Sequence, residues 1–100
     1  MNEELFIYGT LRLPEIQLLI IGRKVEQIPD ILKNYKITNI FIKETEYMAL
    51  IPAEESEING AVITVTKDEL ERVDEYESEE YRRIKVTLES GKVTWVYVKA

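Results

Sequence analysis

The order of apolar and polar positions along the chain predicts a protein built mainly from strands. Short apolar or alternating runs, bounded by Gly, Pro or acidic residues, are typical of strands. The clearest runs cover residues 4–8, 35–43, 47–51, 58–65, 81–88 and 92–99, and residues 23–28 form a further candidate. We expect chain breaks at Pro29–Asp30 and Pro52, a surface loop at residues 54–57, and a hairpin turn around Ser90–Gly91.

Two segments carry helix signals instead. Pro14 suits a first helical position, and Gly22 is a stop signal. Thr66 followed three residues later by Glu69 forms a capping box, and "KDELERVDEYE" continues with helical spacing. About six strands, mostly sequential, with two short helices predict an α+β fold: a small mixed β-barrel rather than a doubly wound sheet.

Length and composition limit the classes of protein that the chain can belong to. One hundred residues with 45% hydrophobic content suit one globular domain over residues 1–100. No apolar run approaches the roughly 18 residues of a membrane span, so no membrane partner is expected. The acidic start "MNEEL" predicts no signal peptide. With no cysteine in the chain, we expect a cytoplasmic protein.

Charge and residue usage narrow the possible chemistry. The net charge is −6 and no basic cluster appears, so no nucleic-acid partner is expected. Glutamate supplies 16 of the 19 acidic residues, a composition that favours a thermophilic source. Because the chain has neither His nor Cys, acid–base chemistry must come from a carboxylate, a lysine or a tyrosine. The pattern indicates no particular oligomeric state.

Glu77 is the acid that helical spacing turns towards the interior. Leu70 and Val73 define the buried stripe, and Glu77 lies about 20° from Leu70 on the helical wheel. Apolar neighbours would raise the pKa of Glu77, because they disfavour its charged form, and would suit it to acid–base work. Two alternatives remain: Glu77 leaves a frayed helix for solvent, or it caps a backbone or pairs with Arg83. Asp74, beside the stripe, is expected to be structural, accepting a hydrogen bond from a loop.

Two further patterns place groups that bind or position a ligand. Gly9 follows the first strand, and backbone N–H groups of the loop formed by Tyr8, Gly9, Thr10 and Leu11 can face a ligand there. Turns of this kind are common, and the loop is not a phosphate loop. Tyr81 alternates with the arginine two residues later on one strand face, where the simpler interpretation is a core aromatic beside a charge partner.

Several motifs occur together and in order along the chain. These are "FIYGTLR" near the N-terminus, Gly60-Ala-Val in a strand, Leu70-x-x-x-Asp74-x-Tyr76-Glu77, and Tyr81-x-Arg83. The set resembles the γ-glutamylcyclotransferase-like superfamily, in its short AIG2-like branch. "LPEIQLLIIGR" also resembles that branch's Arg-x-Pro…Gly-Arg segment, and "YMALIP" resembles its Tyr-Pro-x-Leu-x-Pro run. The resemblance covers about residues 6–97.

The resemblance implies a small mixed β-barrel with flanking helices and one cavity. It implies that Glu77, which matches the family's Asp-x-x-Glu-Gly motif, is the general acid and base. It implies that the loop from Tyr8 to Leu11 binds a γ-glutamyl group, with Tyr81 positioning the substrate and Arg83 and Asp74 in support. The substrate's α-amino group would attack its own γ-carbonyl, giving 5-oxoproline and releasing an amine or amino acid, with no cofactor or metal.

One position departs from the family pattern. The family's acid is followed by Gly, whereas Ser78 stands here, so a side chain narrows the cavity or alters the loop. The alternative function is therefore a non-catalytic module that binds a small metabolite in the same barrel, since a fold does not fix an activity. A third hypothesis is an interaction domain whose acids are solvated.

Overall fold

The computed structural model describes residues 2–100, which form five strands, two α-helices and two short 3₁₀ helices. The strands are β1 (Asn2–Ile7), β2 (Ile28–Ile42), β3 (Thr45–Thr66), β4 (Tyr81–Thr87) and β5 (Val93–Lys99). The helices are α1 (Pro14–Ile20), α2 (Lys67–Glu77), η1 (Thr10–Arg12) and η2 (Ser78–Glu80).

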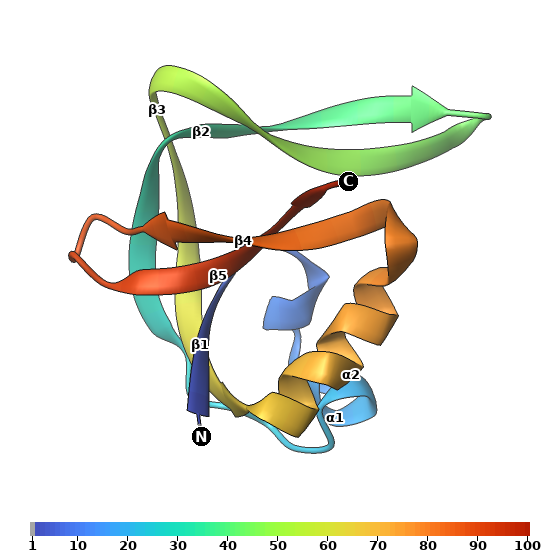
Figure 1. Ribbon diagram of the computed structural model, residues 1–100, viewed down its shortest axis with the longest axis vertical. Coiled ribbons are helices and arrows are strands. Elements are labelled where there is room, and N and C mark those ends of the chain that lie inside the picture. The colour runs from blue at the N-terminus through green and yellow to red at the C-terminus, as the bar shows by residue number, and fades with distance from the viewer. Residues whose placement is uncertain (1) are drawn as a thin grey trace.

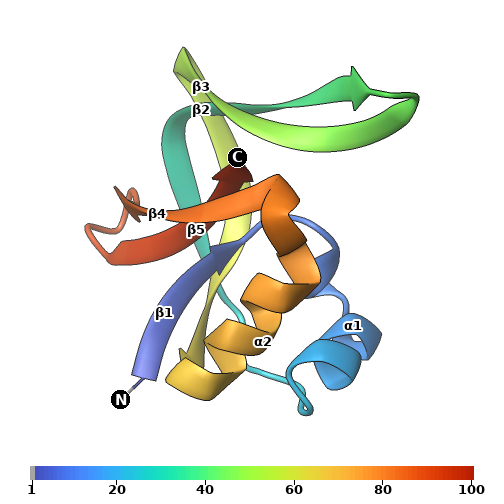
Figure 2. The ribbon, with the colours of Figure 1, turned by 45° about the vertical axis from the view of Figure 1, so that its right-hand side comes forward.

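The strands form a mixed sheet in the order β2-β3-β1-β5-β4. Neighbouring strands are antiparallel except β1 and β5, which pair in parallel at Leu5 and Trp95. The sheet curls into an open half-barrel, and α1 and α2 lie together beside it (Figures 1 and 2). The predicted α+β class is confirmed, with a half-barrel in which the described residues contribute five strands.

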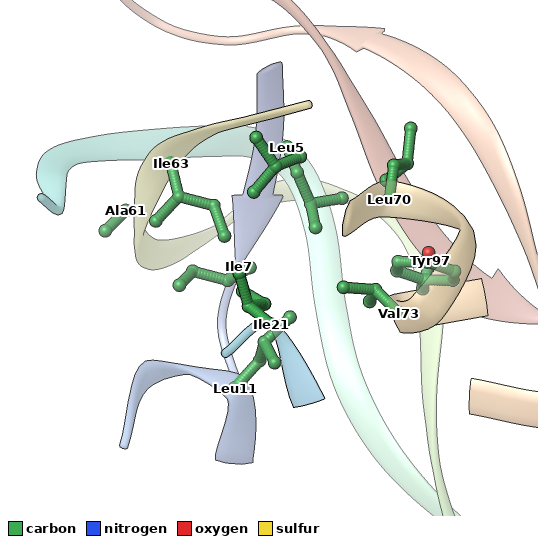
Figure 3. Close-up of a cluster of buried hydrophobic side chains, with 10 residues drawn as sticks. Leu5, Ile7, Leu11, Ile21, Ala61, Ile63, Leu70, Val73 and Tyr97 are labelled. Atoms are coloured by element: carbon green, nitrogen blue, oxygen red, sulfur yellow. The ribbon is translucent and has the colours of Figure 1, made fainter. Parts of the chain in front are cut away.

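The helix α2 is held against the sheet by the stripe that its spacing predicts. Leu70 and Val73 are 2% and 0% exposed and pack with Leu5, Ile7 and Ile63 of the strands (Figure 3). Fully burying an aliphatic side chain of this size contributes about 1.5–3 kcal/mol. This packing fixes the rotation of α2 and therefore the direction of the residues at its C-terminal end.

The start of α2 confirms the capping box and adds an ion pair to it. The Glu69 N–H donates to Thr66 Oγ1 at 3.1 Å, and the Thr66 N–H donates to Glu69 Oε1 at 2.9 Å. Arg23 donates two hydrogen bonds to the same carboxylate, at 2.8 and 2.9 Å. The hydrogen bonds from Arg23 lower the pKa of Glu69 to about 2. Glu69 is thus a buried cap.

The expected strand at residues 23–28 is wrong, because side chains hold most of this segment as coil. The Val25 N–H donates to Gln17 Oε1 at 3.1 Å, and Gln27 exchanges hydrogen bonds with Arg12. The strand β2 begins only at Ile28 and continues through the expected break at Pro29–Asp30. Because β2 lies at the edge of the sheet, the missing N–H of proline is tolerated there.

The expected strand end at Pro52 is also wrong, since β3 runs unbroken from Thr45 to Thr66. The pairing with β2 shifts between Lys33 and Tyr35, which face Glu57 and Pro52, so residues 53–56 bulge out of the ladder. The bulge lies where the sequence predicted a loop. Bulges bend strands, and the ribbon turns sharply here (Figure 1).

Gly60 allows β1 and β3 to approach closely. A Cβ atom at this position would lie 2.5 Å from the Ile7 carbonyl oxygen and 2.5 Å from Phe6 Cζ. Real Cβ atoms do not tolerate such distances, so another residue here would displace the end of β1. That end leads directly into the loop that the sequence marked as ligand-binding.

Candidate active site

A cavity of about 400 Å³ opens where the β1–η1 loop meets the C-terminal end of α2. Its lining residues come from five parts of the chain: Phe6, Ile7, Tyr8, Gly9, Thr10, Leu11, Tyr47, Met48, Tyr76, Glu77, Ser78, Glu80, Tyr81 and Tyr97. The loop and Glu77 therefore line one cavity. Arg83 and Asp74 lie behind its wall, next to a second, more polar hollow.

Glu77 enters this cavity from the last turn of α2. Burial raises the pKa of Glu77 to about 7, and the negative charge of Asp74, three residues earlier on the same helix, adds to the effect. The helix reaches Glu77, so the carboxylate does not fray into solvent. A carboxyl group that titrates near neutral pH is suited to both accept and return a proton.

Arg83 does not neutralise Glu77, because it is engaged by Asp74. The Arg83 guanidinium donates to both Asp74 oxygens, at 2.7 and 3.0 Å, and the Tyr97 O–H donates to Asp74 Oδ1 at 2.6 Å. The guanidinium also lies 4.5 Å above the Trp95 ring. Asp74 is therefore structural, as expected, but its partners come from β4 and β5 rather than from a loop.

The β1–η1 loop is held from both sides. The Tyr8 O–H donates to the Tyr97 carbonyl at 2.8 Å, and Thr10 Oγ1 lies 3.0 Å from the Tyr76 hydroxyl of α2. Thr10 and Leu11 open a 3₁₀ helix, so their N–H groups lack intrahelical acceptors, and the described residues supply none. Both residues line the cavity.

Gln17 anchors the loop from within the core, and the sequence analysis missed it. Its amide donates to the Leu11 carbonyl at 3.0 Å and accepts from the Val25 N–H, while the side chain is only 1% exposed. The available signal was one polar residue inside the apolar run "IQLLIIG". A buried polar side chain must be satisfied by partners, so it commonly has a structural task.

Tyr47 and Met48 also line the cavity and were also missed. They reach it from β3 because the ribbon of β2 and β3 bends back over the molecule (Figures 1 and 2). The Tyr81 O–H donates to the Met48 carbonyl at 2.9 Å, and Lys99 Nζ lies 5.1 Å from the centre of the Tyr47 ring. No local pattern in the sequence signals this contact.

Ser78, which departs from the family pattern, adopts a backbone conformation that favours glycine. Its φ of 63° and ψ of −169° lie in a region that side chains rarely adopt. Ser78 lines the cavity directly after Glu77. The turn therefore retains its geometry, and the serine adds a side chain to the wall.

Residues 2–100 contain neither a cluster of metal ligands nor a membrane-length apolar helix. No group of three or more acidic, His or Cys side chains is arranged to hold a metal ion. None of the helices in this range is long and apolar enough to cross a membrane.

A curled mixed sheet with two helices and a half-buried glutamate at its cavity defines a class of small α+β proteins, and comparisons identify the family within it. The family model described as "Gamma-glutamyl cyclotransferase, AIG2-like" matches residues 5–100. The chain therefore belongs to the AIG2-like γ-glutamyl cyclotransferase family.

Similar proteins agree with this assignment. AIG2-like protein B of Arabidopsis thaliana is 35% identical over 81 residues, which are 80% of this chain and 46% of that protein. The chain spans about half the length of the curated relatives that it matches. A solution structure of an Arabidopsis thaliana protein matches 99% of this chain and 62% of its own, with 25% identity and a TM-score of 0.79. A structure titled "Gamma-glutamyl cyclotransferase" matches 100% of this chain and 68% of its own; its 18% identity and TM-score of 0.78 show the shared fold.

Proposed function

We propose that the protein is an enzyme that cyclises a γ-glutamyl amine or peptide to 5-oxoproline. The observation that carries the proposal is Glu77, a carboxyl with a pKa of about 7 that lines one cavity with Thr10 and Leu11, whose N–H groups have no acceptor among the described residues. Membership of the family supports the same reaction. The substrate would be a small molecule, and the cavity of about 400 Å³ has room for one.

In the proposed reaction, the substrate's α-amino nitrogen attacks its own γ-carbonyl carbon. Ionised Glu77 first takes a proton from the α-ammonium group. A new C–N bond closes the five-membered ring while the original amide C–N bond breaks. Glu77 returns its proton to the leaving nitrogen, and the second proton that the ring nitrogen must lose also passes to the departing amine, which leaves as an ammonium ion. The N–H groups of Thr10 and Leu11 would hold the substrate carboxylate or the oxyanion. Holding the chain in a folded form supplies much of the rate, because the reaction is intramolecular.

Tyr8 and Tyr81 are assigned to positioning rather than to proton transfer. Burial, followed by the charge of Glu77, raises the pKa of both phenols above the usual value, so both stay protonated at neutral pH. Each hydroxyl already donates to a backbone carbonyl. Their rings form walls of the cavity, with Tyr8 beside the loop and Tyr81 below the β2–β3 ribbon.

The test is release of 5-oxoproline from a panel of γ-glutamyl compounds. Glu77→Gln should lower turnover by a factor on the order of 10² or more, whereas Tyr81→Phe should have a smaller effect. Glu75→Gln, an exposed acid on the same helix, is the matched control and should leave turnover unchanged. An N-acetylated γ-glutamyl compound should bind without reacting, because it lacks the nucleophilic amine.

A non-catalytic binding module is the second candidate, and Ser78 in place of the family's glycine is the observation that favours it. In that case the parent protein would bind γ-glutamyl compounds without releasing 5-oxoproline. Ser78→Gly would then separate the two functions, because it restores the family's residue without altering Glu77. Turnover by the parent would reject the binding-module function.

A further inference from the structure

The ribbon of β2 and β3 continues beyond the bulge as an arm, formed by residues 35–42 and 45–52. In both ribbon views the arm crosses above the C-terminal end of α2 and its tip projects freely (Figures 1 and 2). Tyr47 and Met48 of the arm line the cavity, so the arm forms one of its walls.

The strand register shows which side chains of the arm share a face with Met48, whose Cε lies 3.8 Å from the position that a Cβ atom at Gly9 would take. Directly paired residues in antiparallel strands point to the same face, as do residues two apart. Met48 therefore shares a face with Leu50, which is buried in the core, and with Glu46. Ile37 pairs with Leu50 and Phe41 pairs with Glu46, so they lie on this face too.

These side chains extend the apolar lining of the cavity outwards. Met48, Ile37 and Phe41 are 37%, 39% and 71% exposed, and we call these three residues the apolar strip. Phe41 is the diagonal neighbour of Met48 across the strand pair, which is within reach of long and aromatic side chains. A strip that is exposed but continuous with a cavity is suited to the body of a ligand whose reactive end lies inside.

The charges around this path disfavour a second carboxylate. The ionisable acids lining the cavity are Glu77 and Glu80, and its described lining contains neither Lys nor Arg. The nearby Lys99 ammonium is already paired with Glu80, at 3.1 Å. Glu46 adds a further negative charge on the same face of the arm. An anionic leaving group would meet repulsion along this path, and an uncharged one would not.

We propose that the leaving group is a hydrophobic amine without a carboxylate, whose alkyl or aryl body passes Met48 and lies along the apolar strip. The inference rests on the proposed function, because it assigns the part of the substrate that is not cyclised. The substrate class is therefore γ-glutamyl conjugates of alkyl or aryl amines, rather than γ-glutamyl amino acids.

The experiment compares kcat/KM for the γ-glutamyl ethyl, butyl and hexyl amides. Each added methylene should raise kcat/KM by about twofold, the effect of half-burying it, so that hexyl exceeds ethyl by more than about tenfold. Two matched pairs test the charge argument. γ-Glutamyl-phenethylamine should be preferred to γ-glutamyl-phenylalanine, which differs by one carboxylate, and the hexyl amide to the 6-aminohexyl amide. Preference for the amino acid or for the aminohexyl conjugate would overturn the inference.

Phe41→Ala tests the apolar strip directly, and its exposed position makes the substitution mild for folding. It should lower kcat/KM for the hexyl amide about threefold and leave the ethyl amide unchanged. Leu19→Ala, a 76% exposed apolar residue on α1 outside the cavity lining, is the control and should change neither. Equal effects of Phe41→Ala on both amides would place the strip outside the substrate's path.

The outcomes separate this inference from the proposed function. Turnover of the ethyl amide without any gain on lengthening the chain would retain the function and reject the strip. If none of the conjugates is cyclised, the proposed function fails. Calorimetric binding of the same amides to the parent protein then tests whether the apolar strip binds the alkyl chain. Tighter binding of hexyl than ethyl, reduced by Phe41→Ala, would support the strip, and equal affinities would reject it.

Discussion

Glu77→Gln should stabilise the folded protein, and the gain should depend on pH. The folded pKa of about 7 lies above the ordinary value of 4.5, so the folded state holds the proton more tightly than the unfolded chain. Below pH 4.5 both states are protonated and Glu77 carries no penalty. As the pH rises from 4.5 to 7, the unfolded chain ionises first and stability falls. Above pH 7 the whole penalty is present.

The size of the effect follows from the same two values. A rise from 4.5 to about 7, at 1.36 kcal/mol per pH unit, corresponds to about 3 kcal/mol. Glutamine has nearly the same shape and does not ionise, so the variant lacks the penalty at every pH. At pH 8 the variant should unfold with a free energy about 3 kcal/mol higher than the parent, while at pH 4 the two should nearly agree. In a chain of 100 residues this equals roughly 10 °C or more in Tm.

The assay is urea unfolding of parent and variant at pH 4, 5.5 and 8, followed by circular dichroism. Taking the difference between pH 8 and pH 4 removes the constant contribution of replacing a carboxyl by an amide. Glu75→Gln, on the exposed side of α2, should give a small difference that does not change with pH in this manner. If the free energies of unfolding of parent and Glu77→Gln differ by the same amount at pH 4 and pH 8, the reasoning is refuted, because the carboxyl of Glu77 would then titrate normally in the folded protein.

Three further predictions concern the supports of the site. Gly60→Ala should lower the free energy of unfolding by about 1–3 kcal/mol, because its Cβ would lie 2.5 Å from the Ile7 carbonyl; unchanged urea unfolding would contradict the close approach. Glu69→Gln should lower the free energy of unfolding by about 1–2 kcal/mol at pH 7, a modest amount because Arg23 is half exposed and solvent screens the ion pair. This deficit should vanish as the pH falls to about 2. Ser78→Gly should raise Tm by relieving a φ of 63°, worth about 1 kcal/mol; a lower Tm would contradict strain at this turn.

The features that short-range patterns control could be predicted from the sequence. The capping box at Thr66, the buried stripe of α2 and the inward direction of Glu77 depend only on helical periodicity and neighbouring residues. The extent of the strands could not be predicted in the same way. The segment from Pro52 to Glu57 contains a proline and several acids, yet it stays in β3 because its two ends pair with β2 on either side of the bulge. Pairing with a partner overrode the local propensity.

The candidate site likewise combines residues that the sequence marked with residues that it did not. The Tyr8–Leu11 loop and Glu77 were marked by their residue types and their positions at the ends of elements. Tyr47 and Met48 were not, because they reach the cavity only after the arm bends at the bulge. Gln17 was visible as a polar residue in an apolar run, but its partners Leu11 and Val25 are known only from the folded chain.

The hydrogen bond from Tyr8 to the Tyr97 carbonyl joins residues that are 89 positions apart. Closing such a distance early in folding is entropically unfavourable, and non-local pairing of this kind makes folding slow. An intermediate holding only the β2–β3 hairpin and α2 would already contain Glu77, but it would lack the walls supplied by β1 and β5. Glu77 would then lie in water with an ordinary pKa. The proposed reaction would therefore require the complete cavity, and if it occurs, the time course of 5-oxoproline release during refolding should lag behind the recovery of helix.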